Sequence, residues 1–119
     1  MNLFVSQPMA GLTDAQILKR REELIELVRK RNPEEEIIPI DSFTKSEEIV
    51  GRGRIAMLGD SISLMADADL VIFARGWQNS KGCIVENEVC KQYGIRRIFE
   101  ELMNTAKEPE QKPTGQFWR

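Results

Sequence analysis

Short apolar runs alternate along the chain with longer segments in which apolar residues recur every three or four positions. The first run covers Leu3–Val5. In the segment behind it, the apolar positions are Ile17, Leu18, Leu24, Ile25 and Val28. This spacing predicts a strand followed by an amphipathic helix that ends near Asn32. Thr13 and Gln16 match a capping box, so we expect the Thr13 side chain to bond the amide of Gln16 at the helix start.

The same alternation continues through the rest of the chain. Ile37–Ile40 predicts a second strand, and Pro39 favours an irregular or edge position because proline cannot donate a ladder hydrogen bond. The further elements expected are a helix over Ile55–Ala66, a strand over Leu70–Ala74, a helix over Gly82–Tyr93 and a strand over Arg97–Phe99. The run over residues 70–74 is apolar on both faces, which is typical of a central strand in a parallel sheet.

Strand–helix alternation over 119 residues predicts a single three-layer α/β domain, with helices on both faces of a parallel sheet of four to five strands. We expect this domain to cover residues 1–100 and a polar C-terminal tail to cover residues 101–119. Ligands of such sheets bind beyond the carboxyl ends of the strands. The loops expected at this edge are Ser6–Gly11, Asp41–Gly53 and Arg75–Gly82.

The amino-acid composition limits the reactions that this chain could catalyse. The chain has no histidine, which excludes Ser-His-Asp and Cys-His nucleophile systems, an imidazole base and a histidine-ligated metal. Any reaction must therefore use carboxylates, cysteines, hydroxyls, lysine or backbone dipoles. A net charge of −2 argues against a dedicated nucleic-acid binder, which normally shows a basic stripe.

The two cysteines give an expectation about the compartment. Cys83 and Cys90 are seven residues apart, which on a helix is two turns and too far for a disulfide within that helix. We expect two buried thiols in a reducing cytoplasm. The longest apolar stretch, Leu70–Ala74, is far too short to cross a bilayer, so we expect a cytoplasmic protein with no membrane partner.

One acidic residue interrupts the apolar stripe of the helix expected over residues 82–93. With about 100° per residue, a sector about 160° wide contains Val85, Val89, Tyr93, Glu86, Cys90 and Cys83. A carboxylate in such a stripe is unfavourable unless it has partners or a task. Glu86 is therefore either a functional carboxylate or a structural one bonded to an arginine or to loop amides.

Other polar positions permit a functional and a structural interpretation. Asp60 points away from the apolar stripe of its helix and is expected to be a solvated surface acid. Ser80 is a candidate N-cap that can also hold an anion or a ribose hydroxyl. Trp77 can stack on a base or cover the end of the sheet. The loop over residues 6–11 can bring amides to a phosphate, although it lacks a GxGxxG or Walker pattern.

Together these segments resemble the nucleoside 2-deoxyribosyltransferase-like family, which includes the 2′-deoxynucleoside 5′-phosphate N-hydrolases. The chain is most similar to a small bacterial and phage branch of that family. The likeness covers roughly residues 2–99 and is concentrated in Leu3–Gly11, in Asp60 with Ala66–Ile72, and in Gly76–Glu86. The resemblance implies a flavodoxin- or Rossmann-like fold.

The resemblance also implies an activity: cleavage or transfer at the N-glycosidic bond of a (deoxy)nucleoside or its 5′-monophosphate. Glu86 would be the nucleophile that forms a glycosyl-enzyme ester, and Asp60 would orient it or assist protonation of the leaving base. The residues that would bind substrate are Ser6, Gln7, Pro8, Met9, Gly11, Trp77, Ser80 and Gly82. No cofactor and no metal would be required. The partner would be a small-molecule nucleoside or nucleotide, and a homo-oligomer is implied.

Three interpretations follow for the function. Transferases of the family carry an acid six residues before the nucleophile, and Ser80 stands there in this chain, which favours a nucleotide hydrolase. The first loop also lacks the tyrosine and the glycine-rich run that are typical of the hydrolases. The alternative is a non-catalytic module that binds a nucleotide or a nucleotide-derived signal. In a third interpretation, Glu86 is a structural ion-pair member of an oligomeric scaffold.

Overall fold

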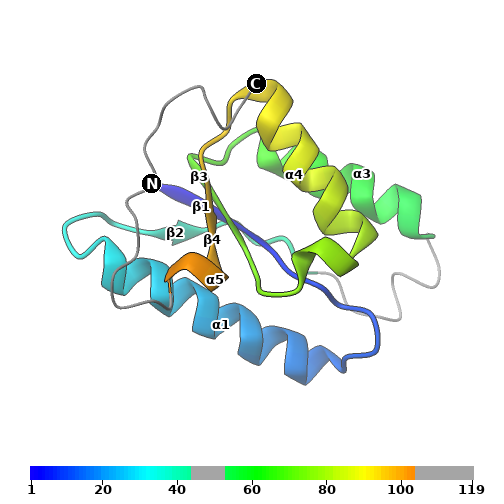
Figure 1. The fold of residues 1–119 in the computed structure, drawn as a ribbon, viewed down its shortest axis with the longest axis horizontal. Helices are drawn as coiled ribbons and strands as arrows, with labels where there is room; N and C mark the ends of the chain where they lie inside the picture. Colours follow the sequence, from blue (N-terminus) through cyan, green and yellow to red (C-terminus); the bar gives the residue numbers. More distant parts are fainter. Residues whose placement is uncertain (44–52, 104–119) are drawn as a thin grey trace.

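The computed structural model describes residues 1–43 and 53–103, which fold as a three-layer, flavodoxin-like α/β domain (Figure 1). The described strands are β1 (Asn2–Ser6), β2 (Ile38–Pro39), β3 (Leu70–Phe73) and β4 (Arg97–Phe99). They form a four-stranded sheet in the order β2-β1-β3-β4, and every pairing in it is parallel. The expected fold class is thereby confirmed.

Helices cover both faces of this sheet. One face carries α1 (Asp14–Arg31) and α5 (Glu100–Met103), and the other carries α3 (Arg54–Met65) and α4 (Lys81–Tyr93), as Figure 1 shows. A short 3-10 helix, η1 (Trp77–Asn79), leads from β3 to α4. In the part of the chain that the structure describes, no helix is both long and apolar enough to span a membrane.

The start of α1 confirms the predicted capping box. The Thr13 hydroxyl accepts a hydrogen bond from the Gln16 amide at 3.1 Å, and the Gln16 side chain accepts one from the Thr13 amide at 2.9 Å. Two backbone donors that the helix cannot satisfy internally are thus satisfied. The buried face of α1 consists of Ile17, Leu24, Ile25 and Val28. Leu18, which was expected on the same stripe, is 42% exposed.

The two central strands, β1 and β3, divide the core into two clusters because successive strand residues point to opposite faces. On the face covered by α1, the sheet contributes Leu3, Val5, Leu70 and Ile72. On the face covered by α3 and α4, it contributes Phe4, Val71 and Phe73, which pack with Met65 and Cys90. All four residues of β3 are buried, so its predicted central position is confirmed. The predicted edge position of β2 is confirmed as well.

Two expected elements differ in detail from the structure. The second predicted helix is present as α3, but Met65 is its one buried residue. Ile55, at its first turn, is 88% exposed. The chain also continues the fold beyond residue 100, because α5 places Met103 in the core under α1. Residues 44–52 of the expected 41–53 loop, and the tail from 104, lie outside the described residues.

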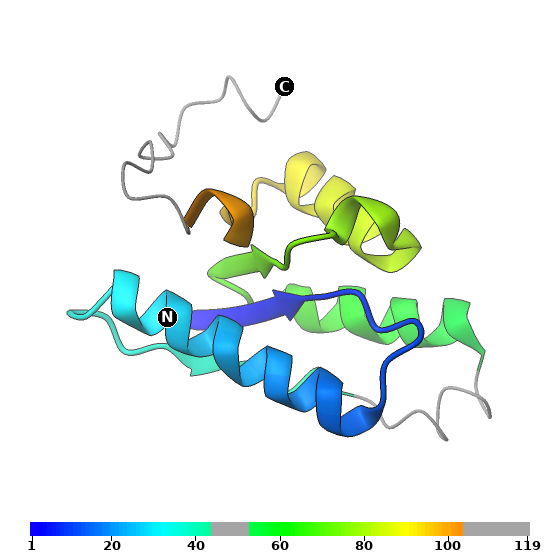
Figure 2. The same cartoon turned by 60° about the horizontal axis from the view of Figure 1, so that its bottom comes forward.

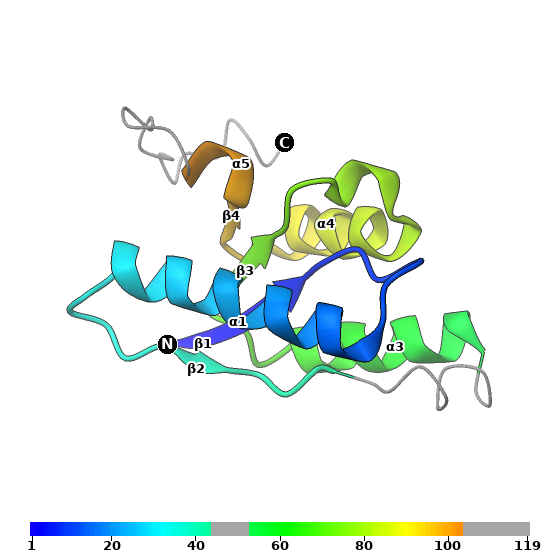
Figure 3. The same cartoon turned by 90° about the horizontal axis from the view of Figure 1, so that it is seen from below.

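The strand order creates a switch point between β1 and β3. From β1 the chain crosses to β2 on one side, whereas β3 lies on the other side, so connections diverge at the carboxyl ends of β1 and β3. Ser6, the last residue of β1, is in register with Phe73, and the Ala74 amide donates to the Ser6 carbonyl at 2.9 Å. In Figures 2 and 3, the loop after β1 and the first turns of α1 and α3 lie at this end of the sheet.

Candidate functional site

Glu86 lies on α4 with its carboxylate turned toward the sheet, and it is 7% exposed. The buried residues of α4 are Cys83, Glu86 and Cys90, so the predicted burial of this acid within a helix stripe is confirmed. Val85 and Tyr93, which were expected in the same stripe, are 38% and 80% exposed. The buried face of α4 is therefore narrower than the predicted stripe and is shifted toward Cys83 and Cys90, and Glu86 lies within it.

The hydroxyl of Ser6 is the partner of this carboxylate. Ser6 Oγ donates a hydrogen bond to Glu86 Oε1 at 2.6 Å, and Ser6 is only 1% exposed. Ser6 reaches α4 because it lies on the same face of β1 as Phe4, two residues earlier. An arginine or loop amides were expected in a structural role for Glu86, and the described residues supply a neutral hydroxyl instead.

The surroundings of Glu86 disfavour its charge. Burial raises the pKa of Glu86 from 4.5 to about 7, and the hydrogen bond from Ser6 limits this rise because it favours the ionised form. Both the ionised and the protonated form of Glu86 are therefore populated near neutral pH. A carboxyl group that titrates near the working pH is typical of acid–base and nucleophilic sites, although structural networks also produce such values.

The two thiols next to Glu86 are not activated. Cys83 and Cys90 are free and buried, as predicted. Burial raises the pKa of Cys83, and hydrogen bonds with Ser6 and Ser80 oppose this rise. Burial also raises the pKa of Cys90 to about 12, against the influence of Arg97. Since the thiolate is the reactive form, neither cysteine is a nucleophile at neutral pH, and Glu86 remains the reactive group of this cluster.

Ser80 fixes the start of α4 as predicted. Its hydroxyl accepts a hydrogen bond from the Cys83 amide at 3.4 Å. Gly82, in the first turn, lies close to α3: a Cβ at this position would be 3.9 Å from Leu58 Cδ1. Ser80 and Gly82 therefore hold the helix that carries Glu86 against its neighbours. Whether they also contact a ligand stays a prediction.

Trp77 packs against the sheet. Its ring centroid lies 5.6 Å from that of Phe73 and 5.5 Å from that of Phe99. The rings of Phe73 and Phe99 are themselves stacked, with their centroids 5.4 Å apart, so the three rings form one aromatic group. Of the two roles expected for Trp77, these contacts support the covering of the sheet end.

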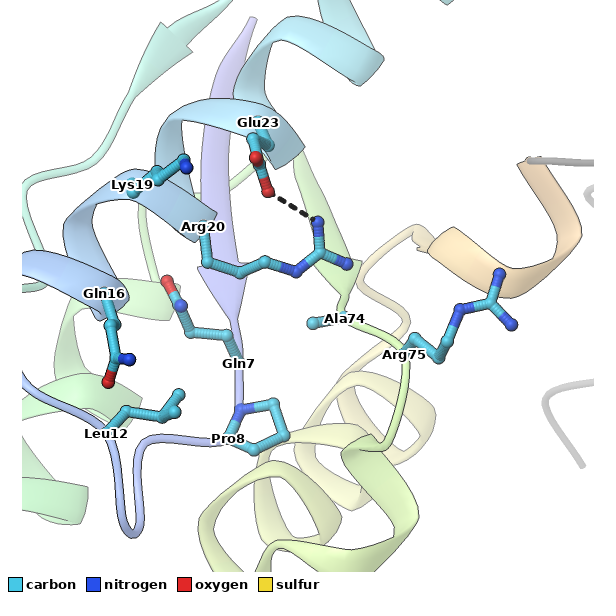
Figure 4. A pocket seen from close by; sticks show the side chains of 9 residues that line it. All are labelled: Gln7, Pro8, Leu12, Gln16, Lys19, Arg20, Glu23, Ala74 and Arg75. Carbon is cyan, nitrogen blue, oxygen red and sulfur yellow. Dashed lines mark hydrogen bonds and ion pairs between the residues drawn. The ribbon is translucent and has the colours of Figure 1, made fainter.

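The loop after β1 lies beside an open depression of about 390 Å³ on the α1 side of the sheet (Figure 4). Gln7, Pro8 and Leu12 line it together with the first turns of α1 and the end of β3. Gln7 Nε2 also donates to the carbonyl of Ile17 at 3.2 Å. Glu86 is not among the lining residues, because the Ser6 side chain that binds it points to the face of the sheet that carries Phe4, away from α1. The predicted binding loop over residues 6–11 therefore contributes to both faces of the sheet at the switch point. Ser6 binds Glu86 on the α4 side, and Gln7 lines the depression on the α1 side.

The remaining predicted site residues occupy exposed positions. Met9 is 41% exposed, and its carbonyl accepts a hydrogen bond from the Leu12 amide at 3.1 Å, which closes a turn around Gly11. Gly11 has a φ of 80°, a left-handed conformation that favours glycine. Asp60 is exposed on α3, as its helix position predicted, whereas Glu86 is buried on α4. The catalytic role implied for Asp60 by the resemblance stays a prediction.

A second buried carboxylate at this end of the sheet was missed by sequence reasoning. Glu100 follows β4 directly, forms an ion pair with Arg20 of α1, and accepts a hydrogen bond from the Arg75 amide at 2.7 Å. Burial alone would raise the pKa of Glu100, but its bonds with Arg20 and the Arg75 amide lower it overall. An acid directly after a parallel strand was the available signal, since that position lies at the ligand-binding edge.

Buried Arg97 was also missed. Its Nη1 atom donates to Asn87 Oδ1 at 2.6 Å, and its guanidinium lies 5.6 Å from the centroid of the Phe99 ring. Burial lowers the pKa of Arg97, and the nearby Cys90 and Glu88 oppose this shift. Arg97 thereby ties β4 to the middle of α4. This arrangement is structural support for the helix that carries Glu86.

The described residues place a carboxylate that titrates near neutral pH at the switch point, with one oxygen bound to a buried hydroxyl. Such a group can take up a proton, donate one to a ligand, or attack an electrophilic carbon. The arrangement itself does not select among these three reactions. No family model, curated protein or solved structure matches the chain.

Proposed function

We propose that this protein cleaves the N-glycosidic bond of a deoxynucleoside or of its 5′-monophosphate, with Glu86 as the nucleophile. The observation that carries the proposal is the buried Glu86 carboxylate at the carboxyl end of β1, held by Ser6 through one oxygen. The transition state of this reaction resembles an oxocarbenium ion, which a carboxylate both stabilises and can bond covalently. The resemblance to the nucleoside 2-deoxyribosyltransferase-like family supplies the substrate class.

The chemistry needs two steps. In the first, the Glu86 carboxylate attacks the anomeric carbon, and the bond from that carbon to the base breaks. The electron pair of the broken bond leaves with the base, which takes up a proton from water. In the second step, water attacks the same carbon, loses a proton and releases the sugar from the Glu86 ester. The presence of Ser80 where transferases carry an acid favours water over a second base as the acceptor.

Nucleotide binding without turnover is the second candidate function. Glu86 is 7% exposed, so a substrate must reach a carboxylate that is largely covered in this structure. In its protonated form, Glu86 can donate a hydrogen bond to a ligand oxygen or ring nitrogen without any covalent step. The raised pKa of Glu86 makes this form available at neutral pH.

The decisive experiment measures free base. We expect the purified protein to release base from at least one member of a panel of deoxynucleosides and their 5′-monophosphates, detected by chromatography. Glu86→Ala is expected to abolish the release. Release that survives in Glu86→Ala would contradict the proposed role of Glu86. A nucleotide that binds tightly and is recovered intact by mass spectrometry would replace the enzyme proposal by the binding one.

The pH dependence gives a second test. Protonated Glu86 cannot attack, so kcat/KM is expected to rise about tenfold per pH unit below 7 and to level off above the pKa of about 7. The measurement is the initial rate of base release between pH 5 and 9 at constant ionic strength. A rate that falls as the pH rises through 7 would mean that the protonated form is the active one.

A further inference from the structure

Ser6, the hydrogen-bond partner of Glu86, lies in an unusual position for a polar side chain. Ser6 is the last residue of the central strand β1 and is 1% exposed. Phe4, the nearest β1 side chain on this face, belongs to the apolar cluster with Met65 and Phe73. A buried hydroxyl in this environment is unfavourable without a partner, and the hydrogen bond to Glu86 Oε1 at 2.6 Å provides one.

The geometry distinguishes the two carboxylate oxygens of Glu86. A serine hydroxyl has a single proton, and here Ser6 donates that proton to Oε1. Within residues 1–43 and 53–103, Oε2 has no hydrogen-bond partner. Oε2 is not among the fully buried, unpaired side-chain atoms of that part of the chain, so it is not completely covered. One oxygen is therefore held by Ser6, and the other is left without a hydrogen bond.

We propose that Ser6 is the positioning residue of Glu86, holding Oε1 so that Oε2 is the oxygen that attacks the anomeric carbon. This inference rests on the proposed function. Oε2 supplies the electron pair of the new carbon–oxygen bond, and Ser6 keeps its proton throughout both steps. As the negative charge of the carboxylate is consumed on Oε2, the Ser6 hydrogen bond fixes the plane of the carboxyl group against rotation.

Ser6 also controls how much of Glu86 is ionised. The titratable groups that face Glu86 from its own helix are the neutral thiols of Cys83 and Cys90. Arg97 of β4 lies beside Cys90, whereas β3 and α3 present the apolar Phe73 and Met65 on this side. The Ser6 hydroxyl is thus the group at the carboxylate that favours its charged form, as the pKa of Glu86 reflects.

The test is a set of variants at position 6 in which the ionisation of Glu86 is followed directly. In Ser6→Ala we expect the titration midpoint of Glu86, measured by carboxyl infrared absorption or by NMR of labelled glutamate, to move up by about one pH unit. At pH 7 this leaves roughly fivefold less ionised Glu86. The rate profile is expected to shift by the same amount, with a lower kcat and a nearly unchanged KM.

Matched variants separate this role from a merely structural one. Ser6→Thr keeps the hydroxyl and is expected to restore both the midpoint and the rate, while Ser63→Ala, on the exposed face of α3, leaves both unchanged. Ser6→Cys, a weaker donor, is expected to shift the midpoint in the same direction as alanine, and it serves if the alanine variant does not fold. A midpoint that stays in place in Ser6→Ala or Ser6→Cys would overturn the inference. A shifted midpoint in a protein that releases no base would instead contradict the proposed function.

Discussion

Replacing Glu86 by glutamine is expected to abolish base release while making the fold more stable at pH 8. Glutamine has nearly the same shape and keeps an oxygen for the Ser6 hydroxyl, but it cannot form the glycosyl ester. We expect a loss in kcat of roughly 1,000-fold or more, as for other catalytic nucleophiles. The gain in stability is expected because burial disfavours the charged carboxylate of Glu86, whereas the glutamine amide is neutral.

The sign and the pH window of this gain follow from the pKa of Glu86. Because burial raises it from 4.5 to about 7, the folded state holds the proton more tightly than the unfolded chain. The contribution of Glu86 to stability is therefore fully present below pH 4.5 and is lost as the pH rises through 7. The loss amounts to about 3 kcal/mol. Glu86→Gln avoids it, so its advantage over the wild type is expected to be small at pH 4.5 and full at pH 8.

Urea unfolding of both proteins at pH 5 and at pH 8 measures this difference. Glu88→Gln is the matched control, since Glu88 is exposed on the same helix and its replacement is expected to change the free energy of unfolding by less than about 0.5 kcal/mol. If Glu86→Gln is instead less stable than the wild type at pH 8, the ionised carboxylate stabilises the fold. That result would support the structural interpretation of Glu86.

Replacing Arg20 by alanine is expected to lower the free energy of unfolding by about 2–3 kcal/mol. The change leaves the Glu100 carboxylate, whose side chain is 7% exposed, without its ion-pair partner. This value lies at or below the lower end of the range for broken buried pairs because the Arg20 side chain is 35% exposed and partly screened by solvent. Since Arg20 and the Arg75 amide lower the pKa of Glu100, the loss is expected to be largest at neutral pH and to shrink as Glu100 is protonated in acid.

Two variants control for the loss of an arginine from α1. Arg29 pairs with Glu26 on the exposed side of the helix, at 43% and 57% exposure, so Arg29→Ala is expected to cost less than about 1 kcal/mol. Adding Glu100→Gln to Arg20→Ala is expected to recover part of the stability, because it removes the uncompensated charge. Equal effects of Arg20→Ala and Arg29→Ala on the denaturation midpoint would contradict a buried ion pair between α1 and α5.

This ion pair also bears on the candidate site. Glu100 accepts a hydrogen bond from the Arg75 amide, which begins the segment between β3 and α4. Figure 4 shows the Arg20 guanidinium reaching from α1 toward Ala74 at the same strand end. The Arg20–Glu100 pair therefore holds the end of β3, from which the chain enters η1 and the capped start of α4. Weakening the Arg20–Glu100 pair is therefore expected to make the segment that positions Glu86 less rigid.

The sequence by itself determined the features that depend on neighbours along the chain. The Thr13–Gln16 capping box, the edge position of Pro39 and the central strand over residues 70–73 follow from local spacing and backbone chemistry. The burial of Glu86 was predictable for the same reason, since helix geometry relates residues three to seven positions apart. These rules need no knowledge of where other segments lie.

Only the tertiary structure decided which distant groups meet. Ser6 and Glu86 are 80 residues apart, as are Arg20 and Glu100, and both pairs form because the strand order brings the carboxyl ends of β1, β3 and β4 to one edge. The exposure of Val85 and Tyr93, which share the predicted stripe with Glu86, is set by how α4 packs on the sheet and not by its own periodicity. Long-range pairing depends on strand order and register, and spacing within a single segment carries no information about either.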